Sequence, residues 1–158
     1  MDGRGKMDWK FFGGWTCLTA AGWALGIPLI AAMALLGEAL GIGGIQVLEM
    51  LGLKPTVYHM NEGHSAFMGL ERIRLMLKEN PELNFQQALE ICRSSTIFTT
   101  HTPVPAGLER FGFDLIDEHF GYMWQDLGIN RDQFLDMGRE DMGGYQLYSM
   151  AVLALNLS

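Results

Sequence analysis

Hydrophobic residues begin to recur at helical spacing directly after a short β-rich run in the first half of the chain. Residues Thr56–Tyr58 supply the β-branched and aromatic side chains that suit a strand. The polar residue Asn61 follows as a candidate helix N-cap. Beyond it the apolar positions keep the period of an α-helix: Ala66, Phe67, Leu70, Ile73 and Leu77. The pattern predicts a strand, a tight turn and an amphipathic helix.

A second β-rich run, Thr96–Thr100, ends just before Pro103 and Pro105. Residues that precede proline are pushed towards extended conformations, so this strand should end in a rigid polar loop. Two helical patterns, His64–Glu79 and Phe85–Arg93, separate the two predicted strands. That length of chain is enough for a crossover, and the sequence therefore predicts two parallel strands of one α/β sheet.

Polar side chains follow both predicted strands at the point where each strand ends. In open α/β sheets ligands bind outside the carboxyl ends of the strands, and parallel strands bring these ends to one edge. The candidate site residues at this edge are Asn61, Glu62, His64, His101 and Thr102.

Most of the remaining apolar positions predict short helices. The first covers Ile45–Leu51 and is stopped by Gly52, with the glycine-rich residues 41–44 as a turn that enters it. Later glycines and Asp/Asn residues divide the chain into further helical pieces. These pieces are Leu108–Phe111, Leu115–Phe120, Tyr122–Leu127, Asp132–Met137 and Leu147–Leu157.

The chain before residue 41 has a different composition, because no charged residue occurs from Phe11 to Gly37. An apolar run of this length is typical of a transmembrane helix. A buried segment of a soluble protein is a second interpretation, and foreign sequence from a frame-shifted reading frame is a third. The sequence thus predicts two regions: residues 1–40, an apolar helical segment, and residues 41–158, an α/β domain.

Composition and charge argue against some classes of protein and indicate the cellular compartment. The formal net charge of −7 argues against nucleic-acid binding, for which a basic surface would be expected. Cys17 and Cys92 lie in unrelated contexts and show no metal or redox pairing, which suits a reducing compartment. We expect a cytoplasmic protein, which would be membrane-associated if residues 11–37 were a real anchor.

A zinc site is not expected, although His59, Glu62 and His64 follow the pattern H-x-x-E-x-H. The zinc motif that this pattern imitates places its two histidines four residues apart on one helix, whereas these are five apart and straddle a strand end. No metal ligand is therefore assigned.

Two motifs together resemble the α-glucan (glycogen and maltodextrin) phosphorylases. They are His-Met-Asn-Glu-Gly-His-Ser-Ala-Phe at residues 59–67 and Phe-Thr-Thr-His-Thr-Pro-Val-Pro-Ala-Gly at residues 98–107. The resemblance extends from about Gly41 to Ser158. It implies a partial Rossmann-like domain, the N-terminal half of a GT-B glycosyltransferase. It also implies phosphorolysis of α-1,4-glucan to glucose 1-phosphate with pyridoxal phosphate as cofactor.

The resemblance also implies roles for particular residues. The histidine that matches His101 lies against the glucosyl unit, where its backbone carbonyl would stabilise positive charge on the sugar, so His101 is the candidate catalytic residue. Asn61, Glu62, His64 and Thr102 would line the substrate pocket. Nothing in this chain matches the lysine-bearing domain that holds the cofactor, so no cofactor-binding residue is assigned.

We therefore expect a phosphorylase fragment that is inactive by itself, with glucan and phosphate as the family's partners. Two alternatives remain open. One is a fragment of a glycogen or starch synthase-like glycosyltransferase, which shares the architecture. The other is a membrane-tethered, non-catalytic carbohydrate-binding protein.

Overall fold

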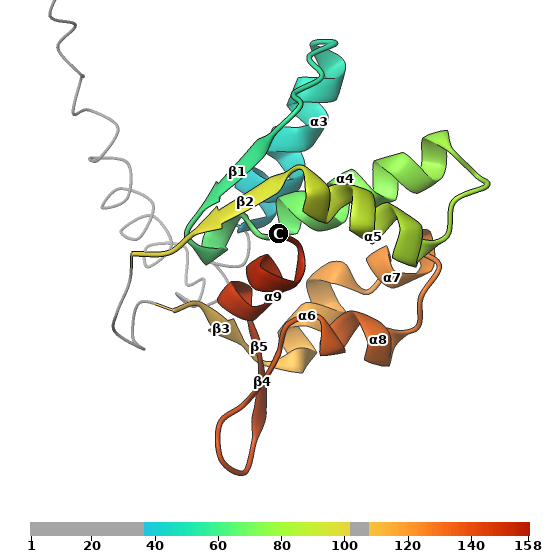
Figure 1. The fold of residues 1–158 in the computed structure, drawn as a ribbon. Helices are drawn as coiled ribbons and strands as arrows, with labels where there is room; N and C mark the ends of the chain where they lie inside the picture. Colours follow the sequence, from blue (N-terminus) through green and yellow to red (C-terminus); the bar gives the residue numbers. More distant parts are fainter. Residues whose placement is uncertain (1–36, 102–107) are drawn as a thin grey trace, which may run out of the picture. The chain divides into compact units, whose positions relative to one another are not determined.

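The structure, a computed structural model, describes residues 37–101 and 108–158. These residues form an α/β arrangement of short strands and helices (Figure 1). The apolar run that predicted a membrane helix lies outside the described residues except for Gly37, and the candidate residue Thr102 lies outside them as well. The proposed boundary between residues 40 and 41 stays a prediction.

Two short strands form a parallel pair, as the sequence predicted. Strand β1 is Tyr58–Asn61 and strand β2 is Thr96–Thr99. Tyr58 is paired with Thr96 and Asn61 with Thr99, so the two strands start and end level with each other. The prediction of an α/β fold with two parallel strands is confirmed.

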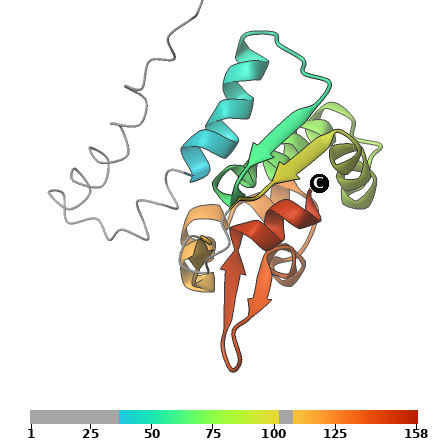
Figure 2. The same cartoon turned by 60° about the vertical axis from the view of Figure 1, so that its left-hand side comes forward.

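Two helices lie between these strands in the chain. Helix α4 is Phe67–Glu79 and helix α5 is Phe85–Ser94. Asn84 starts α5 with a capping box, because its side chain accepts from the Gln87 amide and the Gln87 side chain accepts from the Asn84 amide, both at 3.0 Å. Figures 1 and 2 show α4 and α5 packed against each other, mainly to the right of the β1–β2 pair in both views.

The glycine-rich residues 41–44 are helical, so the turn predicted for them is wrong. A π-helical turn, Glu38–Ile42, continues directly into helix α3, Gly43–Met50. Gly41 is buried against α4, and a Cβ at this position would lie 2.9 Å from the Met68 nitrogen. The glycine therefore permits a close approach of two helices and does not mark the end of one.

The chain after residue 108 contains more strand than the sequence predicted. Strand β3, Arg110–Phe111, replaces a predicted helix, and it pairs antiparallel with β5, Gln146–Ser149. Strand β4, Arg139–Asp141, pairs with the other side of β5. The turn of the β4–β5 hairpin contains Gly143 and Gly144, whose φ values of 79° and 127° suit glycine best.

Four helices complete the described chain. They are α6 (Phe113–Phe120), α7 (Met123–Asp126), α8 (Arg131–Asp136) and α9 (Met150–Asn156). Helix α9 is shorter than the predicted helix from residue 147, since Leu147, Tyr148 and Ser149 belong to β5. The hydrophobic run there packs first as a strand and then as a helix.

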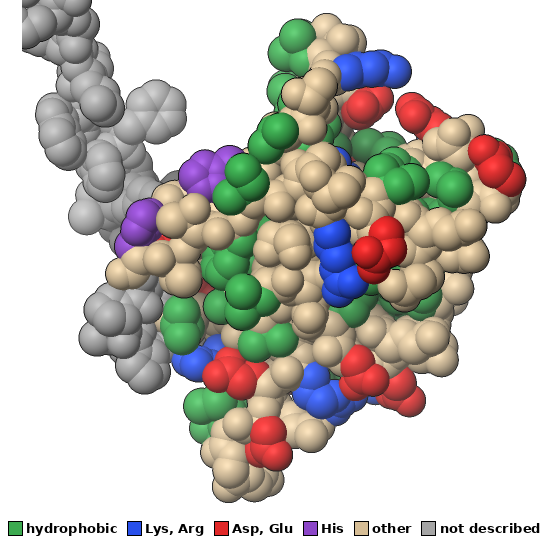
Figure 3. Space-filling model, viewed as in Figure 1, with side chains coloured by type: hydrophobic (Ala, Val, Ile, Leu, Met, Phe, Trp, Pro, Cys, Tyr) green, Lys and Arg blue, Asp and Glu red, His purple; other side chains and the backbone are tan. Residues whose placement is uncertain are grey.

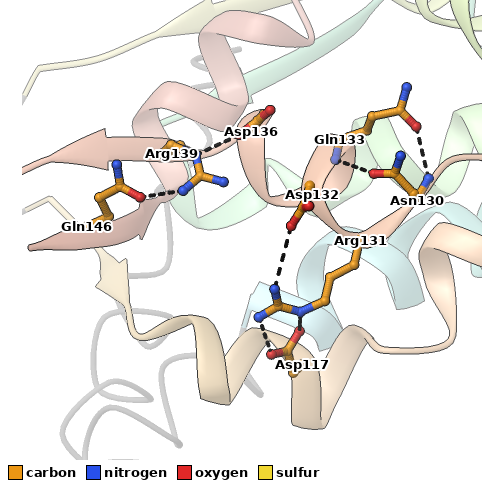
Figure 4. A network of polar contacts seen from close by, with 8 residues as sticks. All are labelled: Asp117, Asn130, Arg131, Asp132, Gln133, Asp136, Arg139 and Gln146. Carbon is orange, nitrogen blue, oxygen red and sulfur yellow. Dashed lines mark hydrogen bonds and ion pairs between the residues drawn. The ribbon is translucent and has the colours of Figure 1, made fainter.

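Polar contacts fix α8 at both ends (Figure 4). Asn130 and Gln133 form a capping box at its start. Arg131 reaches back to Asp117 of α6 through two hydrogen bonds of 2.7 and 2.6 Å. Just beyond α8, the Arg139 guanidinium donates to Asp136. These contacts hold α8 against α6 and the start of β4.

An aromatic cluster joins the β1–β2 part of the fold to the later elements. The Phe67 ring of α4 stacks on Phe120 of α6, with centroids 4.0 Å apart. Tyr148 of β5 stacks against Phe67 at 6.5 Å and against Phe134 of α8 at 6.0 Å. All four side chains are fully buried, so this cluster is the centre of the core.

Within residues 37–101 and 108–158, no helix combines the length and the apolar character that crossing a membrane would require.

Candidate functional site

The candidate site is built where β1 and β2 end side by side. The parallel ladder continues one residue beyond β1, because the Glu62 amide donates to the Thr99 carbonyl at 2.8 Å. The next residues of both segments are therefore held next to each other. Figure 3 shows histidine side chains (purple) on the side where β1 and β2 end in the view of Figure 1.

Glu62 connects the two strand ends through its carboxylate. One carboxylate oxygen accepts from the Thr100 hydroxyl at 3.0 Å, and the other accepts from the His101 backbone N–H at 2.6 Å. The second bond is short, as is usual for an ionised acceptor. The end of β2 is thus fastened to the residue that follows β1.

The backbone of Glu62 is strained. Its φ of 65° and ψ of 169° fall in a region that is almost reserved for glycine, and it is the only described non-glycine residue with positive φ. Such a conformation costs about 1–3 kcal/mol and is frequent at functional sites. The chain therefore carries a glutamate at a position where glycine would fit the backbone better.

Asn61 holds the imidazole of His101. Its side-chain Oδ1 lies 3.0 Å from His101 Nε2, and this contact is a hydrogen bond when Nε2 carries the proton. The predicted role of Asn61 as a helix N-cap is wrong, since it is the last residue of β1 and α4 starts only at Phe67. With Nε2 donating, the other ring nitrogen, Nδ1, is an acceptor in neutral His101.

His64 lies in the single 3₁₀ turn Gly63–Ser65 that links Glu62 to α4. Burial lowers the pKa of His64 below its ordinary value, and the nearby negative charge of Glu62 opposes this shift. His64 and His101 therefore both lie beside Glu62, on the edge where the sequence predicted them. Thr102 lies outside the described residues.

The 3₁₀ turn that carries His64 packs against the start of α9. A Cβ on Gly63 would lie 3.0 Å from the Ala151 nitrogen and 3.1 Å from the Met150 Cβ, so only glycine fits this contact without a shift. Ser149 caps α9 through its hydroxyl, which accepts from Val152. The close contact with helix α9 thereby holds this turn in place at the ends of β1 and β2.

His59 belongs to a separate contact. Its Nε2 lies 2.9 Å from the Thr99 hydroxyl on the exposed face of the β1–β2 pair. Glu62 faces the end of β2 instead, so the residues of the H-x-x-E-x-H pattern contact different groups.

Glu109 is a site residue that the sequence analysis missed. Its backbone carbonyl accepts from the Met150 amide at 3.0 Å, which places it beside the start of α9. Burial, the larger cause, and the negative charge of Glu62 together raise the pKa of Glu109 to about 7. Two carboxyl groups therefore influence each other at this edge. Strand β3, which follows Glu109, has two residues, too few for its alternation to be told from helical spacing.

An imidazole, a carboxamide and a carboxyl group meet at the strand ends, and they offer donors and acceptors close together. Such a set suits a ligand with many hydroxyl groups. Preorganised backbone dipoles at the same place can also stabilise charge that develops on a bound ligand.

Comparison with known proteins gives matches over most of the chain. The family model described as carbohydrate phosphorylase matches residues 48–153, which include the ends of both β1 and β2. A maltodextrin phosphorylase from Thermococcus litoralis is 44% identical over 119 residues, which cover 75% of this chain. Glycogen phosphorylases from Mycobacterium tuberculosis and Aquifex aeolicus are 37% and 29% identical, each again over 75% of this chain.

The chain is much shorter than these relatives. It spans 13% of the length of the Thermococcus litoralis protein, 15% of the Mycobacterium tuberculosis protein and 17% of the Aquifex aeolicus protein.

Proposed function

This chain belongs to the carbohydrate phosphorylase family, and on that premise we propose that the ends of β1 and β2 form part of the α-1,4-glucan site of such an enzyme. The reaction would be the phosphorolysis of the glucan to glucose 1-phosphate. The names of the relatives, which refer to maltodextrin and glycogen, support a glucan as the substrate class.

One observation carries the proposal: His101 is held from two sides at the strand ends. Asn61 holds its ring and Glu62 its backbone N–H. The Glu62 contact orients the Thr100–His101 peptide, and the proposal is that the His101 carbonyl, which follows it in the chain, stabilises positive charge on a glucosyl unit. In this proposal His101 is the catalytic residue, with Asn61, Glu62, His64 and Thr102 around the sugar.

The finer fold assignment belongs to the same proposal. A parallel pair of strands, joined through α4 and α5, is the repeating unit of doubly wound α/β domains. We infer that β1 and β2 are two strands of a larger Rossmann-like sheet in the N-terminal half of a GT-B architecture. Ligand binding at the carboxyl ends of the strands is the rule in such sheets.

The described residues do not fit the pyridoxal phosphate that the family resemblance implies. This cofactor is held through a lysine. The described lysines, Lys54 and Lys78, are both exposed. Lys54 precedes β1 and Lys78 lies in the last turn of α4, so neither is at the carboxyl ends of the strands. We therefore assign to this chain only a part of the glucan-binding site, and the proposal includes no step that involves the cofactor.

The proposal is tested by titrating the isotope-labelled chain with maltopentaose and following backbone amide signals by NMR. We expect the largest shifts at Asn61, Thr100 and His101. Cellopentaose, with β-1,4 links between the same sugar units, is the matched control and should give smaller shifts. Shifts that are equal for both sugars, or that centre on the α8 cap at Asn130, would contradict the proposal.

A further inference from the structure

Among the described site residues, Glu62 differs in its backbone conformation, because its φ is positive. A glutamate occupies a conformation, φ 65° and ψ 169°, that glycine adopts with less strain. A glutamate at this position costs strain that glycine would avoid, and contacts of its side chain can offset that cost. The contacts of Glu62 indicate what this contribution is.

Both carboxylate oxygens of Glu62 are directed at the end of β2. They accept from the Thr100 hydroxyl at 3.0 Å and from the His101 amide at 2.6 Å. Thr100 and His101 follow the last paired residue of β2, Thr99, and no ladder partner from β1 reaches them. Glu62 thus replaces the missing ladder contact at the point where the chain leaves the sheet.

We propose that Glu62 is a positioning residue, which fixes the backbone of His101 and acts on a ligand through that residue. Asn61 holds the His101 ring, and Glu62 holds the N–H of the same residue, so the two neighbours together restrict both the side chain and the backbone. Fixing a functional group through the contacts around it is what preorganisation requires.

This assignment refines the pocket-lining role that the family resemblance implies for Glu62. It rests on the proposed function in one respect only, namely that the His101 carbonyl stabilises positive charge on a glucosyl unit. The contact itself is a property of the free chain, so its test needs no glucan. A failed test of the contact can therefore be told apart from a failure of glucan binding.

The direct measurement is made on the wild-type chain by NMR. A hydrogen bond from the His101 amide to the Glu62 carboxylate should give a through-bond coupling between the amide nitrogen and the carboxyl carbon. The His101 amide proton should also lie downfield, because its acceptor is charged. Absence of both signals in the folded wild-type chain would overturn the proposal, whatever the variants do.

Two substitutions of Glu62 distinguish a role in positioning the His101 backbone from a role that is limited to supporting the turn after β1. Glu62→Gly suits the positive φ, so the fold should survive, yet the His101 amide should move upfield and exchange roughly tenfold faster. Glu62→Gln keeps the shape with a neutral acceptor, so it should give intermediate values. If Glu62 only supported the turn, Glu62→Gly would retain the wild-type His101 signals, and that result would overturn the proposal.

Asp141 provides a matched control. Its exposed carboxylate accepts from the Gly143 amide at 2.8 Å, which is the same kind of contact in the β4–β5 hairpin. Asp141→Asn should change the Gly143 amide and leave His101 unchanged. A change at His101 in this variant equal to that in Glu62→Gly would show that the His101 signals report general loosening, and would count against the proposal.

Discussion

At the scale of single residues, the charge on Glu62 affects the groups around it in opposite directions. It favours the protonated, charged form of His64, although burial dominates and lowers the pKa of that histidine. It disfavours ionisation of Glu109, and together with burial, the larger cause, it raises the pKa of Glu109 to about 7. Glu109 therefore gains its negative charge at a higher pH than an ordinary glutamate does, and the local charge around it depends on pH.

Glu109→Gln should make the chain less sensitive to alkaline pH. The pKa of Glu109 is about 7 in the folded chain, above its ordinary value of 4.5. The folded state thus binds the proton more tightly, and the stability that this gives is lost as the pH rises from 4.5 through 7. Because Gln cannot ionise, the Tm advantage of the variant over wild type should grow between about pH 5 and about pH 8. We expect about 2–4 °C, the shift that about 1 kcal/mol gives in a chain of this size after allowing for solvent screening.

Glu140→Gln is the control of opposite sign. The Arg110 guanidinium, at 2.8–2.9 Å, lowers the pKa of Glu140, so this carboxylate stabilises the fold at higher pH. Its removal should lower Tm more at about pH 8 than at about pH 4. A Tm difference for Glu109→Gln that is independent of pH would contradict the assigned protonation of Glu109.

At the scale of elements, the packing of the first helical segment on α4 depends on the absence of a side chain at Gly41. An alanine Cβ there would lie 2.9 Å from the Met68 nitrogen and 3.1 Å from the Phe67 Cβ. Since the neighbours are backbone and a core residue, Gly41→Ala should destabilise the fold by about 1–3 kcal/mol. Urea unfolding with an unchanged m-value would measure this loss.

Gly44 is the matched control in the same helical segment. No described atom lies within 4 Å of a Cβ placed there. Gly44→Ala should therefore raise the stability by up to about 1 kcal/mol, through helix propensity alone. Equal effects of the two substitutions would show that close packing at Gly41 is not what the structure describes.

Among the helices, those that the sequence predicted most closely have a clear period or a cap. Helices α4 and α5 have apolar residues at helical spacing, and α5 also has the Asn84–Gln87 capping box. The β4–β5 hairpin was missed because Leu147, Tyr148 and Ser149 run into the apolar residues of α9 without a break. Pairing with β3 and β4 decides that these residues form a strand, and such a tertiary contact leaves no local signal.

At the scale of the whole molecule, the sequence predicted which strand ends meet but not how they are fastened. Parallel topology was enough to bring Asn61 and His101 to one edge. The contacts of Gly63 and of the Glu109 carbonyl with the start of α9 join segments that meet only in the folded chain. Predicting them would have required the position of α9, which lies far along the sequence.

The chain by itself should not catalyse phosphorolysis. Glucan, phosphate and cofactor must be held together in near-attack geometry, and we place only part of the glucan site in this chain. The assay supplies the purified chain with maltodextrin, phosphate and pyridoxal phosphate and measures glucose 1-phosphate. A full-length maltodextrin phosphorylase is the positive control. Cofactor-dependent product from this chain would show that a complete site is present and would overturn the assignment of a partial one.

The central claim is that the joined ends of β1 and β2 bind glucan, and it is tested most directly by comparing maltopentaose affinities of three chains. Asn61→Ala removes the acceptor that holds the His101 ring, while Gln86→Ala removes an exposed amide on α5. We predict that Asn61→Ala weakens binding about fivefold, as the loss of one hydrogen bond worth about 1 kcal/mol would do. Gln86→Ala should bind as wild type does. Equal affinity of all three chains for maltopentaose would contradict the claim.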